Sequence, residues 1–200
     1  MSDREGPVDE RSDQDLVDAM NGGDVAAFEA LYRRHRDWVV RLATRFAGDR
    51  DEALDVLQET FRYFLGKFPG FELRARVTTF LYPVVRHIAI DLGAKRRPAV
   101  GLAAAALEGL VAAPWRSHDA EREELAEVLA ALSPLHREVV LMRFVDGFAL
   151  EEIGVALSIP TGTVKSRLHN ALRTLREDPR TRRHFGVDAD RDEPRPASGR

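Results

Sequence analysis

The segment LEEIGVALSIPTGTVKSRLHNALRTLR, Leu150 to Arg176, decides the fold of the C-terminal part. It predicts a short helix from Leu150 to Leu157, a tight connection at Ser158-Ile159-Pro160, and then a longer helix. In the longer helix, apolar residues recur at the three- and four-residue spacing of one helix face: Val164, Leu168, Ala171, Leu172 and Leu175. Two such helices joined by a tight turn form a helix-turn-helix, whose second helix can enter a DNA major groove.

The opposite face of the second helix is expected to be polar and exposed. It carries Lys165, Ser166, His169, Asn170 and Arg173. Lys and Asn can hydrogen-bond base edges, Ser and His can serve base or phosphate, and Arg can hold the DNA backbone. Gly162 and Thr163 leave the first turn open to a phosphate. The alternative is an ordinary solvated helix face, and periodicity alone does not decide between the two.

The N-terminal part shows three further helical stripes and almost no alternating strand pattern, so the predicted class is all-α. The first stripe is Phe28, Leu31, Tyr32, His35, Val39, Leu42 and Phe46. The second is Leu54, Leu57, Phe61, Phe64, Leu65 and Phe68, and Pro69-Gly70 closes it. The third is Phe80, Leu81, Val84, Val85, Ile88 and Leu92.

The remaining chain divides into tails, a linker and two more helices. Residues 1–12 and 179–200 read as tails, the second basic and then disordered, and residues 98–118, rich in Ala and Gly, read as a linker. The alternative for this linker is a further packed helix, since Ala favours helix. Helices are predicted from Glu121 to Leu132 and, after the Ser133-Pro134 start signal, from Leu135 to Phe144.

The composition of the chain limits the classes of function that are possible. The 200 residues carry a net charge of −3, so any nucleic-acid binding must rest on local clusters of Lys and Arg. The absence of cysteine excludes a disulfide framework. The polar N-terminus is no signal peptide, and no apolar run is long enough to span a membrane, so a cytoplasmic protein is expected. The six histidines lack metal-ligand spacing and no phosphate or nucleophile loop occurs, so no enzyme, metal or cofactor is predicted.

The stretch from Leu132 to Arg176 resembles region 4 of bacterial RNA polymerase sigma factors, in particular the extracytoplasmic-function subfamily. The string PTGTVKSR, Pro160 to Arg167, is the most specific part. The resemblance implies that this domain, residues 119–178, reads the minus-35 promoter element. It assigns base reading to the face with Lys165, Ser166, His169 and Asn170, and phosphate contact or packing to Thr163 and Arg167.

Residues 13–97 resemble region 2 of the same subfamily through the string DVLQETF, Asp55 to Phe61. Leu57 and Phe61 belong to the apolar stripe, which leaves a polar set outward: Asp55, Gln58, Glu59 and Arg62. The resemblance implies that this set docks on the clamp helices of the largest polymerase subunit.

The segment Thr79 to Asp91 resembles the region 2 helix that melts and holds the minus-10 element. By this resemblance the exposed residues for unstacked bases and backbone are Tyr82, Arg86 and His87, followed by a basic backbone clamp of Lys95, Arg96 and Arg97. Pro83 departs from the family pattern and should remove a helical hydrogen bond unless the helix starts late. The preceding loop also differs, so the residue that captures a flipped base is placed only within Leu73 to Arg76.

Taken together, the resemblance implies two small helical domains joined by an irregular linker. It implies a sigma factor that binds core RNA polymerase through its clamp helices and flap and directs promoter recognition and melting. Promoter DNA and an anti-sigma protein are the further partners, and the free protein should bind DNA poorly. The alternative is a stand-alone helix-turn-helix regulator whose N-terminal half senses a ligand or dimerises.

Overall fold

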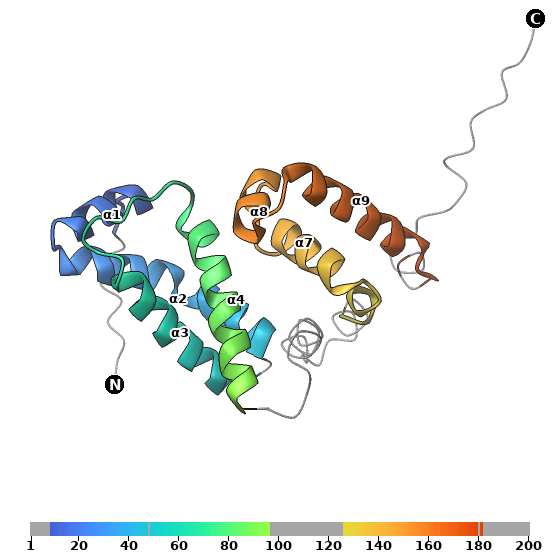
Figure 1. Ribbon diagram of the computed structural model, residues 1–200, viewed down its shortest axis with the longest axis horizontal. Coiled ribbons are helices and arrows are strands. Elements are labelled where there is room, and N and C mark those ends of the chain that lie inside the picture. The colour runs from blue at the N-terminus through green and yellow to red at the C-terminus, as the bar shows by residue number, and fades with distance from the viewer. Residues whose placement is uncertain (1–8, 48, 97–125, 180, 182–200) are drawn as a thin grey trace, which may run out of the picture.

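The computed structural model describes residues 9–47, 49–96, 126–179 and 181, and every regular element in these ranges is a helix. The N-terminal helices are α1 (Asp13–Asn21), α2 (Val25–Ala47), α3 (Arg50–Leu65) and α4 (Val77–Arg96). The C-terminal helices are α7 (Pro134–Phe144), α8 (Leu150–Leu157) and α9 (Thr161–Glu177). Figure 1 shows the two groups as two bodies that meet where α4 faces α8.

Acidic and hydroxyl side chains start the N-terminal helices. Ser12 and Asp15 form a capping box at the start of α1. A carboxylate oxygen of Asp24 accepts from the backbone N–H groups of Ala26 and Ala27, and so satisfies the first turn of α2. Asp49 caps α3 in the same way. These caps are local, so each helix start is written in the few residues around it.

The predicted stripes are confirmed for the first helix and are partly wrong for the second. In α2 the stripe faces the core: Phe28 and Tyr32 are half-buried and the other members are buried, including His35, which is 8% exposed. In α3 the inward line runs through Ala53, Val56, Leu57, Thr60, Phe61 and Phe64. Leu54 and Leu65 were expected in this core but are 41% and 43% exposed. Each follows an inward residue by one position, which turns it about 100° around the helix axis and away from the core.

Helix α4 starts at Val77, so Pro83 lies inside it and not in its first turn. A proline has no N–H to donate to the carbonyl four residues earlier, here that of Thr79. The Pro83 ring itself is exposed, which keeps it out of the packed side of the helix. The predicted loss of one helical hydrogen bond therefore applies within the helix.

The helix-turn-helix forms as predicted. Helix α8 ends at Leu157, and Ser158 caps it in the left-handed conformation at φ 54°. The backbone N–H of Ile159 then donates to the Gly154 carbonyl at 2.9 Å. A Cβ at position 154 would lie 2.9 Å from the Ile159 carbonyl oxygen, so the turn needs glycine there. The expected start of α7 is also present, because Ser133 caps it and Pro134 is its first residue.

The two groups of helices pack against each other and share a contiguous apolar core. Buried residues of the C-terminal helices join the same cluster as Leu81 and Tyr82 of α4: Val139, Met142, Phe148, Ile153, Ala156 and Val164. A second, smaller cluster holds Leu129, Leu132, Val140, Leu141 and Ala171. This docking was not predicted. The expected linker, 98–118, lies outside the described residues. So do residues 121–125 of the helix expected from Glu121 to Leu132, of which 126–130 is helical.

Candidate nucleic-acid interface

Helix α9 presents the polar face that its sequence predicts. Val164 and Ala171 are buried, while Leu168, Leu172 and Leu175 are half-buried. On the other side Lys165, Ser166, His169 and Arg173 are exposed, and Asn170 is half-buried. The Ser166 hydroxyl donates to the Thr163 carbonyl at 3.0 Å. The face therefore offers cationic and amide donors to a partner in solution.

Arg167 occupies a different place on α9. It is half-buried and lines a cavity of about 250 Å³ between the two groups of helices. Pro83 and Arg86 of α4 and Glu138 of α7 line the same cavity. The structure thus separates Arg167 from the outward set that contains Lys165.

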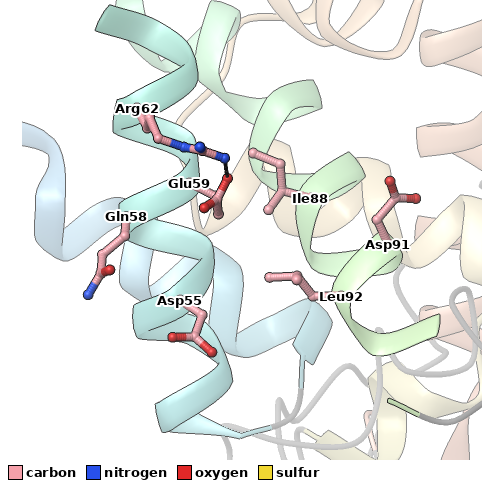
Figure 2. A pocket seen from close by; sticks show the side chains of 7 residues that line it. All are labelled: Asp55, Gln58, Glu59, Arg62, Ile88, Asp91 and Leu92. Atoms are coloured by element: carbon pink, nitrogen blue, oxygen red, sulfur yellow. Dashed lines mark hydrogen bonds and ion pairs between the residues drawn. The ribbon is translucent and has the colours of Figure 1, made fainter. Parts of the chain in front are cut away.

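The polar set of α3 borders a groove. Figure 2 shows Glu59 and Arg62 of α3 beside Ile88 and Leu92 of α4, while Gln58 and Asp91 point outward from the edges of the groove. The groove measures about 480 Å³, and Glu59 and Arg62 form an ion pair on its edge. Its floor is apolar and its rim is charged. Such a surface suits a protein partner with apolar and cationic or amide groups.

The expectation that Tyr82 is exposed is wrong. Its side chain is only 1% exposed, because the C-terminal helices cover this side of α4. Arg86 is partly covered, with 32% of its side chain exposed, whereas His87 stays open and lies 3.6 Å from Asp91. Lys95 and Arg96 lie at the end of α4, but their side chains, like Arg97 altogether, lie outside the described residues.

Glu138 of α7 is the group that meets this covered side. It is 2% exposed, and its Oε1 accepts from the Tyr82 hydroxyl at 3.1 Å and from Arg86 Nε at 2.9 Å. Burial, and then the negative charge of Glu138, raises the pKa of Tyr82 well above its ordinary value of 10. The phenol is therefore a neutral hydrogen-bond donor in this arrangement.

A buried ion pair lies beside these contacts. Arg45 of α2 donates through both terminal nitrogens to Asp146, at 2.7 and 2.9 Å, and the two side chains are 6% and 4% exposed. Burial alone would lower the pKa of Arg45, but the hydrogen bonds and charge of Asp146 outweigh burial and raise it. Helical periodicity does not identify this pair, because Asp146 lies 101 residues from Arg45.

Glu152 of α8 makes the third polar contact between the two groups. Its carboxylate accepts from its own helix start, the Ala149 N–H, at 2.8 Å. It also lies 3.4 Å from Arg76 Nη1 and 3.4 Å from the Thr79 hydroxyl. From the sequence, a glutamate at the third position of a helix indicates an ordinary capping residue, so its second role was missed.

The loop before α4 is anchored by Asn21, which sequence reasoning also missed. The Asn21 side-chain oxygen accepts from the N–H groups of Gly70 and Phe71, and its amide donates to the Phe71 carbonyl at 2.9 Å. Within the loop Arg74 remains open, with 86% of its side chain exposed. In the described part of the chain, no group of His, Cys, Asp or Glu could hold a metal ion. None of the helices described is long and apolar enough to cross a bilayer.

Comparison with known proteins assigns both halves of the chain. Residues 31–98 match the Sigma-70 region 2 family, and residues 128–177 match the Sigma-70, region 4 family. Two solved structures share the fold: CnrH in complex with the cytosolic domain of CnrY (TM-score 0.60, 23% identity, covering 82% of this chain and 94% of that one), and the sigma factor RpoE with the anti-sigma factor NepR from Bartonella quintana (TM-score 0.59, 21% identity, covering 82% and 99%).

Curated relatives are similar over most of their length. The ECF RNA polymerase sigma factor SigW of Bacillus subtilis is 31% identical over 168 residues, which cover 78% of this chain and 90% of SigW. The ECF RNA polymerase sigma factor SigL of Mycobacterium tuberculosis (strain H37Rv) is 33% identical over 164 residues, which cover 80% of this chain and 93% of SigL. The chain therefore belongs to the extracytoplasmic-function family of RNA polymerase sigma factors.

Proposed function

We propose that this sigma factor uses three separate surfaces to start transcription. The exposed face of α9 reads the minus-35 element, the face of α4 holds the melted minus-10 strand, and the groove between α3 and α4 docks on core polymerase. The proposed domains are residues 13–97 for region 2 and 119–178 for region 4. The carrying observation is that α9 turns its cationic and amide side chains outward within the segment that matches region 4.

The division of labour on α9 follows from side-chain chemistry. Lys165 and Asn170 can donate to base edges, whereas Arg173, one turn further along, suits the phosphate backbone. Ser166 and His169 complete the reading face, and Thr163 lies at its N-terminal end. On α4, Arg86 and His87 supply cations for a single strand, with Tyr82 as a stacking ring once it is uncovered. Lys95, Arg96 and Arg97 extend the basic end.

Partners and location follow from the same proposal. Core polymerase and promoter DNA are the partners of a sigma factor, and both place the protein in the cytoplasm. An anti-sigma protein is a further partner, supported by the neighbour RpoE, whose structure contains the anti-sigma factor NepR. The stand-alone regulator is not favoured, because residues 31–98 match region 2 and so belong to a polymerase factor instead of a sensing domain.

The α3 groove is tested by binding to core polymerase. The double variant Gln58→Ala with Glu59→Ala removes two rim groups, one of them ion-paired with Arg62. We expect weaker association with reconstituted core, measured by fluorescence anisotropy of labelled protein, with an unchanged helical CD signal. Asp37→Ala is the matched control, since Asp37 is an exposed acid on α2 away from the groove. Unaltered core affinity in the double variant would remove the groove from the proposal.

A further inference from the structure

We propose that region 4 acts as an acidic latch on region 2, and that the nucleic-acid face of α4 opens only when this latch is released. The latch consists of three carboxylates on the C-terminal helices, Glu138, Asp146 and Glu152, and their partners on the N-terminal helices. The statement that opening exposes a DNA-binding face rests on the proposed function of α4. The closed arrangement follows from the observed contacts alone.

Each latch carboxylate meets a cation of region 2. Glu138 lies 2.9 Å from Arg86, Asp146 lies 2.7 Å from Arg45, and Glu152 lies 3.4 Å from Arg76. A carboxylate and a phosphate compete for the same guanidinium donors, because both offer paired anionic oxygens. While Glu138 is bound, Arg86 cannot present its Nε donor to a DNA strand. Glu138 thus occupies a donor that a nucleic acid on α4 would need.

An apolar contact completes the latch. The Phe148 ring is fully buried and lies 5.7 Å from the Tyr82 ring and 6.3 Å from the Trp38 ring, measured between centroids. Tyr82 is thereby covered on its ring by Phe148 and on its hydroxyl by Glu138. The residue of α4 best suited to stack on a base is therefore buried in the closed form. The same packing makes Trp38 a reporter of closure.

The composition of the contact suits a reversible latch better than a permanent core. Replacing water around buried charges is costly, so a buried ion pair contributes little net stability even when its geometry is good. All the charged partners become hydrated when the two groups separate, whereas an all-apolar contact would not release so readily. Binding of core polymerase, which must space the two regions along a promoter, would supply the opening force.

The latch can be followed without DNA. Trp115→Phe leaves Trp38 as the single tryptophan, and its emission should shift to the red when Phe148 moves away. Because the chain has no cysteine, Tyr63→Cys and Glu177→Cys, both at exposed positions on α3 and α9, allow site-specific dyes for energy transfer between the two regions. Efficient energy transfer between the dyes, together with blue-shifted Trp38 emission, reports the closed form.

Asp146→Asn is the opening variant. It leaves the Arg45 guanidinium buried without a counter-charge in the closed form but not in the open one, so we expect the open fraction to rise at least about tenfold. Arg45→Asp combined with Asp146→Arg should restore high energy transfer, because it re-forms the pair with reversed polarity. Glu151→Gln, an exposed acid on α8, is the matched control and should leave both signals unchanged.

Two results overturn the latch. One is equal energy transfer and equal Trp38 emission in the wild type and in Asp146→Asn. The other is a reversed-charge pair that stays as open as Asp146→Asn although its helical CD is intact. A separate arm measures binding of a short labelled single-stranded DNA of random sequence. Opening without tighter DNA binding upholds the latch and contradicts the proposed role of α4, so the two failures are distinguishable.

Discussion

Helices α4 and α9 both carry polar residues expected to meet DNA, but α9 displays most of its set, whereas α4 leaves only His87 fully open among those whose side chains the structure describes. On α9 Lys165 and His169 are exposed, while on α4 Tyr82 is buried and Arg86 is held by Glu138. Helix α9 needs a single narrow apolar stripe, which its neighbours in the helix-turn-helix satisfy. Helix α4 packs against α2 and α3 on one side and against α8 on another. A helix with two packed sides keeps little of its surface for a ligand.

The breadth of the apolar arc is the feature that separates the two helices. In α4, Leu81 and Val85 are buried together with Tyr82, which lies about 100° further around the axis from Leu81. In α9 only Val164 and Ala171 are fully buried, and they share one face. A wide arc on a helix that already packs on its own domain indicates a second partner. In this molecule the second partner is region 4.

Phe148→Ala should have the largest effect on the difference in exposure between α4 and α9. Removing a fully buried ring that packs on Trp38 and Tyr82 should cost about 3–5 kcal/mol of stability in the closed form. We expect a lower urea midpoint and red-shifted Trp38 emission. The face of α4 that Phe148 covers should then be as exposed as the polar face of α9. Phe144→Ala is the control, because Phe144 is 61% exposed and its loss should change the free energy of unfolding by less than about 0.5 kcal/mol. Equal effects of the two variants would contradict the role of Phe148.

The next effect concerns the face of α9, which should act whether or not the latch is closed. Lys165→Ala and Asn170→Ala should each cost about 1–3 kcal/mol of discrimination at one minus-35 position. A randomised minus-35 library transcribed by reconstituted holoenzyme reads this out as a changed preferred sequence. An identical preferred sequence for the wild type and both variants would show that this face does not read bases.

A smaller effect is a pH dependence that is expected for the covered face of α4 and not for the exposed face of α9. Tyr82 has a raised pKa in the closed form, so its contribution to closure is fully present below its ordinary value of 10 and is lost as pH rises through the raised pKa. Trp38 emission of the wild type should therefore report opening in alkaline solution above that value. Tyr82→Phe should lack this transition and weaken closure at neutral pH by about 1 kcal/mol, the worth of one hydrogen bond. Tyr63→Phe, at an exposed site, should keep the wild-type transition.

The smallest effect is expected from Arg173→Ala. A phosphate contact carries no sequence information, so its loss should weaken binding to all minus-35 sequences alike. The slope of log affinity against log salt should fall by about one. The preferred sequence should remain that of the wild type in the same library experiment. A changed preference would move Arg173 from the backbone to the base-reading set.

Much of this fold is determined by short-range sequence. Ser133-Pro134 starts α7 and Ser158-Ile159-Pro160 separates α8 from α9, because caps and turns depend on residues a few positions apart. The outward face of α9 follows for the same reason, since its apolar stripe packs on elements close to it in the chain. Leu54 and Leu65 show the limit of this reasoning, because a hydrophobic residue near a stripe need not lie on it.

What only the tertiary structure decided is how the two halves meet. Arg45 and Asp146 are 101 residues apart, so no short-range pattern links them. Tyr82 has the same side chain and helix position whether Glu138 and Phe148 cover it or solvent does. Periodicity reports which face of a helix is apolar, but the burial of a polar face depends on the docking of a distant surface with matching charge and shape. That match is a property of two surfaces together, and no single stretch of the sequence contains it.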